Sequence, residues 1–317
     1  MARLRTDEFN AYVALASEGR NSVARIIVGI FVIAAVTVGI GLLIAFGALW
    51  AERLVLAPDD LRSFVFPDGG EAGTAGIVVL LLVSVGFLWL GALTAIRFVH
   101  RRALSTLLGW QRRLAIGDLW RGLVAGIIAA CLLVAAGLLI DPQLERSDIP
   151  LQTWLVMAAP LALLILIQAS AEELVFRGYL HQTLAARFAS PIVWAGLPTV
   201  AFTLLHWYSG ALPWMNAAML VSIGSIAVAM TVLLVRTGNL GAAFGAHTGN
   251  NLVALLVFSV DDELGGASLF HMRGLDDPYW TIGQAVGLTL ISMLGALVLV
   301  VLLLHPRSPL RVRSATA

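Results

Sequence analysis

The chain carries a succession of apolar runs, most of them close to the length that crosses a lipid bilayer. The first, Ile26–Trp50, is too long for the hydrophobic region of a signal peptide and exceeds the roughly 20 residues that a transmembrane helix needs. Seven more follow, at about 75–96, 120–140, 153–175, 192–208, 214–235, 239–260 and 280–304. Only 12% of the residues are charged, against about a quarter in soluble domains. The sequence therefore predicts an all-α, polytopic membrane protein with about eight transmembrane helices.

The arginines alternate between the two sides that these spans define. Six lie in the loop 97–121 and four precede residue 26, whereas Arg273 is alone in a loop that holds five acidic residues. Cytoplasmic loops carry an excess of basic residues, so this alternation predicts that both termini are cytoplasmic. All 20 basic residues are Arg, a usage typical of GC-rich, and hence bacterial, coding sequences. We therefore expect an integral protein of a bacterial cytoplasmic membrane.

The remaining composition sets limits on the organisation of the chain. Leu104–Leu119 predicts an amphipathic helix on the cytoplasmic face. We expect N-terminal transmembrane helices with this surface helix in 1–145, a catalytic core in 146–265, and a C-terminal transmembrane helix with a basic tail in 266–317. The net charge of +1 excludes a strongly basic nucleic-acid binder. The single cysteine, Cys131, excludes a disulfide framework and a cysteine metal site.

Charged residues at the end of the fourth span give the main functional signal. Glu172, Glu173 and Arg177 follow the apolar run Trp154–Ala171, and an ionisable residue at membrane depth is a functional-site hypothesis because it costs several kcal/mol. Glu173 and Arg177 are four residues apart and can pair on one helical face. Glu172 lies about 100° further round the helix. One carboxylate is therefore predicted to be structural, and Glu172 is predicted to be free for chemistry.

A histidine in the fifth span is one candidate to meet Glu172. His206 follows Phe202 by four residues, so the two rings are predicted to share a helical face. A histidine before Trp207-Tyr208 is also typical of the membrane interface, which is the alternative interpretation.

The seventh span supplies a second pair of polar side chains. His247 and Asn251 are four residues apart and are predicted to lie on one face, where inter-helix hydrogen bonding is the alternative to a catalytic role. A stripe of glycines on another face would let a neighbouring helix approach closely, at Gly241, Gly245 and Gly249. Asn216 and His181 are expected to be structural, and His181 lies one turn beyond Arg177.

The three motifs Glu172-Glu173-x-x-x-Arg177, Phe202-x-x-x-His206 and His247-x-x-x-Asn251 occur in this order on separate predicted helices. They resemble the motifs of the CAAX-protease and bacteriocin-processing (CPBP, or Abi) family of intramembrane endopeptidases. Each motif alone is weak, whereas three in order within membrane helices are specific. The resemblance covers about residues 150–260.

The resemblance implies a role for each motif residue. Glu172 and His206 would activate a water for attack on a peptide carbonyl, His247 and Asn251 would stabilise the oxyanion, and Glu173 with Arg177 would support the first helix. Hydrolysis needs a base. It also needs donors where negative charge develops, and losing one such donor typically lowers the rate by a factor on the order of 10²–10³. A neutral His and an Asn amide would be donors without a further buried charge.

No cofactor is expected, and a divalent metal is the alternative. Zinc could bind Glu172, His206 and His247 with one position left for water. The HExxH motif of zinc proteases is absent from the sequence, and Asn251 is a poor zinc ligand. No Ser is grouped with a His and an acid, which disfavours a serine mechanism. We therefore favour a glutamate-type mechanism over a metalloprotease.

Regular spans would keep the two main catalytic candidates apart. Glu172 would lie near the cytoplasmic end of its helix, and His206 would lie about 20 Å further across, at 1.5 Å per residue from Pro191. They meet only if the fourth helix continues towards Arg187, or if the segment around Pro191 and Pro198 is tilted or broken.

Together these features predict an intramembrane endopeptidase with a polar cavity between the fourth and seventh spans, open to the cytoplasm. Its partners would be the lipid bilayer and a membrane-embedded or lipidated protein or peptide substrate. The alternative is a non-catalytic scaffold, immunity or partner subunit that keeps the protease fold within a membrane-protein complex. A transporter ranks last, because the polar residues lie in one half of the chain rather than in two similar halves.

Overall fold

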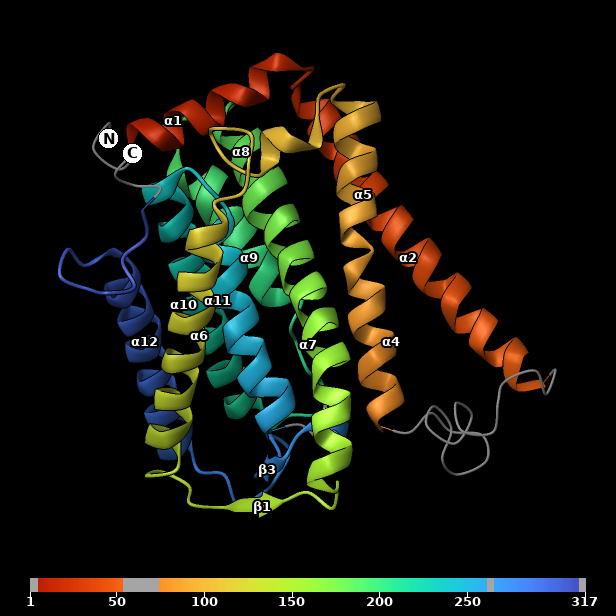
Figure 1. The fold of residues 1–317 in the computed structure, drawn as a ribbon, viewed down its shortest axis with the longest axis vertical. Helices are drawn as coiled ribbons and strands as arrows, with labels where there is room; N and C mark the ends of the chain where they lie inside the picture. The colour runs from red at the N-terminus through yellow and green to blue at the C-terminus, as the bar shows by residue number, and fades with distance from the viewer. Residues whose placement is uncertain (1–4, 54–73, 261–264, 314–317) are drawn as a thin grey trace.

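The computed structural model describes residues 5–53, 74–260 and 265–313, and the fold is given for these residues. Asp261, Asp262 and Glu263, which contributed to the predicted sidedness of the chain, lie outside them. Most of the described chain forms helices that pack into one bundle (Figure 1). The helices are α1 (Asp7–Ala14), α2 (Val23–Arg53), α4 (Thr74–Gly86), α5 (Leu88–Thr94), α6 (Ile116–Gly137), α7 (Leu151–Glu173), α8 (His181–Ala185), α9 (Leu197–Leu204), α10 (Pro213–Thr237), α11 (Gly241–Leu252) and α12 (Ile282–Leu304).

Six helical segments of the described chain are long and apolar enough to cross a membrane. They are Val23–Ile44, Val78–Val99, Ile116–Gly137, Leu151–Ala185, Pro213–Thr237 and Ile282–Leu304. The predicted spans 192–208 and 239–260 are also helical. The helix Ile192–Leu204 is shorter than the roughly 20 residues that a span needs. The helix that begins at Gly241 is not among the six. The prediction of a helical, polytopic protein is thus confirmed, while the full set of eight spans is not.

The fourth helix is much longer than the predicted span 153–175. After α7 the chain continues through a π-helical segment, Leu174–Leu180, directly into α8, so that Leu151–Ala185 is one unbroken helix. Glu172 therefore lies inside this helix rather than near its C-terminal end. The continuation towards Arg187 was one of the two conditions given for a meeting of Glu172 and His206. π-Helical turns are frequent at functional sites.

Glycines bring α11 into backbone contact with α6, as the glycine stripe predicted. A Cβ on Gly245 would overlap the carbonyl oxygen of Leu119, and a Cβ on Gly249 would overlap that of Leu123. Glycines of α6 face α11 in the same way, since a Cβ on Gly126 would overlap the carbonyl oxygen of Ala246. Close packing of this kind fixes the rotation of α11 and hence the direction in which His247 points.

Replacing Gly245 by alanine is expected to destabilise the protein, because α6 and α11 must separate to admit the methyl group. Overpacking of this kind typically costs about 1–3 kcal/mol. The matched control is Gly39→Ala in α2, where a Cβ meets nothing within 4 Å and only gains helix propensity. Thermal unfolding of the two variants in detergent tests the prediction, and equal melting temperatures for both variants and the wild type would contradict it.

Two features at the α1 end of the bundle differ from the expectations. The predicted surface helix Leu104–Leu119 is not formed, because the chain makes a short 3₁₀ turn at Leu104–Leu107 and then a loop up to α6. Arg112 in this loop adopts a positive φ of 59°, which interrupts a helix. By contrast, the polar N-terminal segment contains α1, which is capped by the Thr6 side chain and buries Phe9 and Tyr12.

Buried hydrogen bonds attach α1 and the segment after α5 to the long helix behind the site. The Tyr12 hydroxyl donates to the carbonyls of Leu107 and Gly178, and Gln182 Nε2 donates to the Tyr12 carbonyl. His100 Nε2 lies 2.9 Å from the Tyr179 hydroxyl. Burial, followed by the charge of Arg102, lowers the pKa of His100 to about 4, so His100 is neutral at pH 7.

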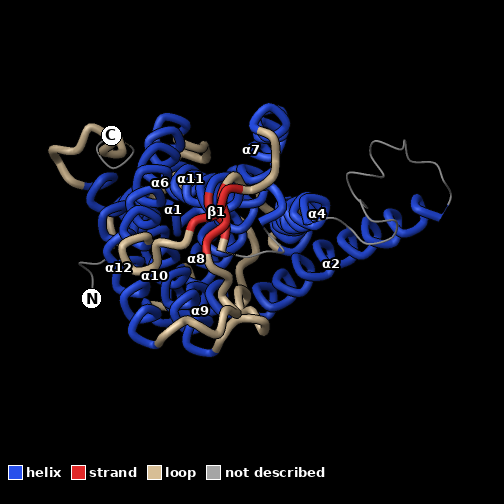
Figure 2. The backbone as a smooth tube through the Cα atoms, turned by 90° about the horizontal axis from the view of Figure 1, so that it is seen from below, coloured by secondary structure: helices blue, strands red, loops and turns tan. Residues whose placement is uncertain are grey.

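A small three-stranded sheet lies at the opposite end of the bundle, beneath the helices (Figures 1 and 2). Its strands are β1 (Leu144–Arg146), β2 (Phe258–Ser259) and β3 (Phe270–Met272), in the order β1-β3-β2. β1 pairs antiparallel and β2 parallel to β3. These short strands were not predicted, since segments of two or three residues leave no alternating pattern in the sequence.

Candidate active site

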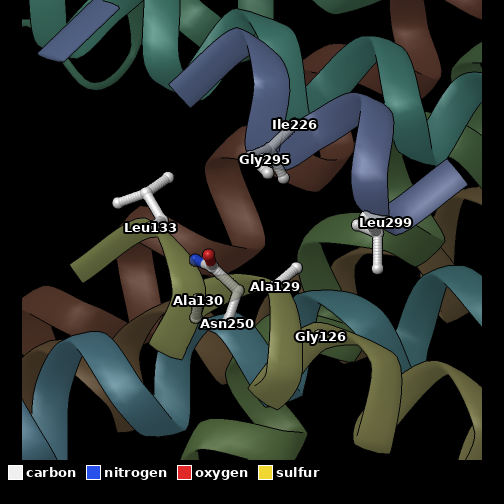
Figure 3. A pocket seen from close by; sticks show the side chains of 8 residues that line it. All are labelled: Gly126, Ala129, Ala130, Leu133, Ile226, Asn250, Gly295 and Leu299. Atoms are coloured by element: carbon white, nitrogen blue, oxygen red, sulfur yellow. The ribbon is translucent and has the colours of Figure 1, made fainter. Parts of the chain in front are cut away.

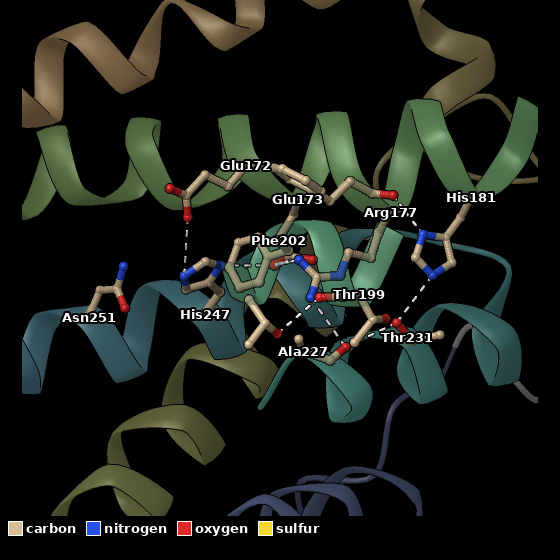
Figure 4. Close-up of polar contacts among 12 residues, drawn as sticks. Glu172, Glu173, Arg177, His181, Thr199, Phe202, Ala227, Thr231, His247 and Asn251 are labelled. Carbon is tan, nitrogen blue, oxygen red and sulfur yellow. Dashed lines mark hydrogen bonds and ion pairs between the residues drawn. The ribbon is translucent and has the colours of Figure 1, made fainter. Parts of the chain in front are cut away.

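Two helices of the bundle, α7 and α11, meet through an acid–histidine contact inside the protein. His247 of α11 donates its Nδ1 proton to Glu173 Oε1 across 2.8 Å, because an ionised carboxylate can only accept (Figure 4). The same oxygen accepts from Arg177 Nη1 at 3.0 Å, which confirms the predicted pairing of Glu173 and Arg177. Glu173 and Arg177 are fully buried. Glu173 therefore fixes the tautomer and ring orientation of His247 as well as pairing with Arg177.

The second nitrogen of the His247 ring, Nε2, is directed towards Glu172. His247 Nε2 lies 3.6 Å from Glu172 Oε2, which is longer than a hydrogen bond. Glu172 is 9% exposed, and its Oε2 has no hydrogen-bond partner within the described residues. An unsatisfied buried carboxylate oxygen costs free energy, and a catalytic role is one physical reason for its presence. Glu173 Oε2 also lacks a hydrogen bond within the described residues, but Glu173 Oε1 accepts from both His247 and Arg177, whereas Glu172 only faces His247 beyond hydrogen-bond distance.

Arg177 holds this cluster to the neighbouring helices. Its Nη2 donates to the carbonyl of Ala227 in α10 at 3.2 Å, and its guanidinium lies 4.4 Å from the centroid of the Phe202 ring. Cation–π contacts of this kind stabilise a guanidinium away from water. The side chain thereby links α7, α9 and α10 around the acid–histidine pair.

Phe202 also brings His206 to the site. The centroid of the Phe202 ring lies 4.7 Å from that of His206 and 6.0 Å from that of His247, so both imidazoles pack against one phenyl ring. His206 is half-buried and follows the end of α9. Its Nδ1 donates to the Phe202 carbonyl at 2.9 Å, which leaves Nε2 of a neutral ring as an acceptor. The Phe202–His206 motif thus lies beside the cluster.

Asn251 lies one turn beyond His247 on α11 but does not contact it. Its Nδ2 donates to Gln168 Oε1 of α7 at 3.1 Å, and its Oδ1 accepts from Asn250 Nδ2 at 3.2 Å. The sequence interpretation missed Gln168. Its signal was a lone amide in an apolar run, four residues before Glu172 and hence on the same face.

The expected structural residues have structural contacts. Asn216 donates to the carbonyl of Tyr208 in the loop before α10. His181 is fully buried, with Nδ1 against the Phe176 carbonyl and Nε2 3.2 Å from the Thr231 hydroxyl.

The hydrogen bonds limit what each imidazole can do. A neutral His247 that donates Nδ1–H to Glu173 has a lone pair at Nε2, so it donates at Nε2 only as imidazolium. The neutral donor considered from the sequence is therefore not available in this arrangement. The charges of Glu172, Glu173 and Arg177 sum to minus one, so an imidazolium at His247 makes the buried cluster neutral.

The cavity open to the cytoplasm stays a prediction, and the long helix is buried at the α1 end of the described structure. From Leu174 to Ala185 every side chain is buried except the half-buried Leu180. A small cavity lies instead among α6, α10, α11 and α12, next to Asn250, and its other lining residues are apolar or glycine (Figure 3). It does not include Glu172, His206 or His247.

Metal ligation was the alternative for Glu172, His206 and His247. Within the described residues, no three His, Cys, Asp or Glu side chains form a group that could hold a metal ion. The Nδ1 atoms of both histidines are engaged with Phe202 and Glu173, so only their Nε2 atoms are available as ligands.

The helices and the buried acid–histidine cluster define an integral membrane protein with a polar site inside its bundle. Residues 153–253 match the Rce1-like family, described as type II CAAX prenyl endopeptidase Rce1-like. This confirms the resemblance to the CPBP family for the segment that contains all three motifs, and the family points to an intramembrane peptidase of the CAAX-protease type.

One curated relative is an uncharacterised protein, YyaK, of Bacillus subtilis (strain 168). It is 28% identical over 226 residues, which cover 67% of this chain and 71% of the relative. No solved structure matches the chain.

Proposed function

We propose that the chain is an intramembrane endopeptidase in which Glu172 and His206 activate a water molecule without a metal. The observation that carries this proposal is the buried Glu172 carboxylate, with an oxygen that lacks a hydrogen bond, facing His247 at 3.6 Å within the segment that matches the Rce1-like family. The proposed substrate is a membrane-embedded or lipidated protein. The proposed location of the chain is a bacterial cytoplasmic membrane.

In the proposed reaction the water lies between Glu172 and the Nε2 atom of His206. Glu172 takes a proton from this water as its oxygen forms a bond to the scissile carbonyl carbon. The same proton then passes to the leaving nitrogen as the C–N bond breaks, so that atoms and charge balance.

The developing oxyanion would be stabilised by His247 Nε2–H and the Asn251 amide. His247 serves this purpose as imidazolium, because Glu173 already accepts its Nδ1 proton. Glu173 and Arg177 then act through His247 by fixing its orientation and balancing its charge.

A non-catalytic scaffold or partner subunit is the second candidate. It is favoured by the bonds from His247 to Glu173 and from Asn251 to Gln168, which also link α11 to α7. It gives no reason for the Glu172 oxygen that lacks a hydrogen bond.

The proposed function is tested by comparing the N-termini of membrane proteins in cells that express the chain with those in cells that lack it. We expect new N-termini inside or next to transmembrane segments, together with loss of the uncleaved precursors. The same cleavage is expected to continue in isolated membranes treated with 1,10-phenanthroline.

A zinc-dependent membrane protease added to the same membranes controls for effective chelation. Identical N-termini with and without the chain would contradict the endopeptidase, and loss of cleavage on chelation would contradict the metal-free mechanism.

A further inference from the structure

Two pairs of side chains connect α7 and α11 like successive rungs. The first rung is Glu172 with His247, and the second is Gln168 with Asn251 (Figure 4 shows the first pair and Asn251). Gln168 precedes Glu172 by four residues, and Asn251 follows His247 by four. Gln168 and Glu172 therefore share one face of α7, and His247 and Asn251 share one face of α11. The two pairs lie about one helical turn, or 5.4 Å, apart.

The second rung fixes the plane and direction of the Asn251 amide. Its Oδ1 accepts from Asn250, and one Nδ2 hydrogen is directed to Gln168 Oε1. An amide nitrogen carries two hydrogens, so one remains on Nδ2 for another acceptor. Within the described residues this second hydrogen has no protein acceptor.

Gln168 is placed to hold that donor rather than to react. It is 8% exposed on α7, and its Oε1 accepts from Asn251 while its Nε2 has no hydrogen bond within the described part of the chain. The other buried polar residue nearby on the helix, Ser170, is engaged elsewhere, since it accepts from Trp89 Nε1 at 3.0 Å and donates to the Ile167 carbonyl.

We propose that Gln168 is a positioning residue that aims the free Asn251 N–H at the oxyanion formed next to Glu172. This inference rests on the proposed endopeptidase function. Without the Gln168 oxygen only the bond from Asn250 still orients the Asn251 amide, and its N–H is no longer held in the direction in which negative charge develops. A misplacement of about 1 Å at a catalytic group can lower a rate by a factor of about 10².

The test measures the N-termini that depend on the chain, in cells that express the full-length protein and its variants. Gln168→Met, which keeps the length of the side chain but removes the acceptor, is expected to reduce their rate of appearance by about 10- to 100-fold. Gln168→Glu retains an acceptor oxygen at the same reach and is expected to restore most of the rate. Ser170→Ala, which loses a buried hydroxyl on the same helix, is the matched control and is expected to cleave like the wild type.

Coupling to Asn251 distinguishes positioning from general support of the fold. The double variant Gln168→Met/Asn251→Ala is expected to cleave no more slowly than Asn251→Ala alone, because Gln168 acts through that amide. Additive losses, or no rescue by Gln168→Glu, would indicate a structural role and overturn the inference.

The variant Glu172→Gln separates this inference from the proposed function. If Glu172→Gln abolishes cleavage while Gln168→Met cleaves like Ser170→Ala, only the role of Gln168 is wrong. If Glu172→Gln cleaves like the wild type, or if no N-terminus depends on the chain, both proposals are wrong.

Discussion

Replacing Glu172 by glutamine is expected to reduce cleavage of membrane-protein substrates by a factor on the order of 10²–10⁴, the usual contribution of a general base. Glutamine has the same shape as glutamate and can still form hydrogen bonds, but it cannot take a proton from water. The variant is expected to fold, because Glu172 Oε2 has no hydrogen bond to lose within the described structure. The measurement is the rate at which substrate N-termini appear, normalised to the amount of protein in the membrane.

The control for this prediction is Glu145→Gln, since Glu145 is an exposed carboxylate on β1, at the opposite end from α1. It is expected to cleave at the wild-type rate. His206→Gln is expected to be as slow as Glu172→Gln, and the double variant no slower than either, because both residues act on one water molecule. Cleavage by Glu172→Gln within about threefold of the wild type would show that this carboxylate is not the base.

The charged and polar residues of the site could be identified from the sequence, but most of the contacts among them could not be predicted. The pairing of Glu173 with Arg177 could be predicted because both lie on one helix, where a spacing of four residues is enough. The hydrogen bond that His247 donates to Glu173 joins residues 74 positions apart. It depends on the rotation of α11, which the glycine contacts with α6 set. The glycine stripe indicated which face of α11 packs closely, but the sequence did not identify α6 as the partner or Glu173 as the acceptor.

The length of the fourth helix was underestimated for a physical reason. Hydropathy falls after Glu172, and a span was therefore ended near residue 175. The polar residues that follow are surrounded by protein rather than lipid, because Arg177, His181 and Gln182 are all fully buried. Hydropathy records the lipid-facing part of a helix, whereas the inner part of this helix is stabilised by hydrogen bonds with α1, with His100 and with α10.

The fifth helix shows the opposite limitation. Its predicted span, 192–208, is apolar enough for a membrane helix, yet α9 ends at Leu204. Because α9 ends at Leu204, His206 lies in the turn that follows it. Its Nδ1 donates to the Phe202 carbonyl there. The four-residue spacing predicted that the two rings would lie together, and this is confirmed by their centroid distance of 4.7 Å. The spacing could not predict that the phenyl ring would also contact His247.

Replacing Arg177 by methionine is expected to destabilise the protein by about 3–5 kcal/mol, the usual effect of removing one partner from a buried ion pair. Arg177 and Glu173 are both fully buried and are joined at 3.0 Å, so the substitution leaves Glu173 with one cationic partner fewer. It also removes the donor to the Ala227 carbonyl and the cation over Phe202. We expect a lower level of folded protein in the membrane and a lower melting temperature in detergent.

Two matched variants show whether the lost charge pairing causes this effect. Arg177→Met/Glu173→Gln removes both charges and is expected to regain a large part of the lost stability, because no buried charge is left without its partner. Glu18→Gln breaks the exposed pair between Glu18 and Arg112 and is expected to cost less than about 1 kcal/mol. If Arg177→Met unfolds at the temperature of Glu18→Gln, the buried pair does not hold α7 in place. The orientation of His247 would then depend on its own bond to Glu173 and on the packing of α11 against α6.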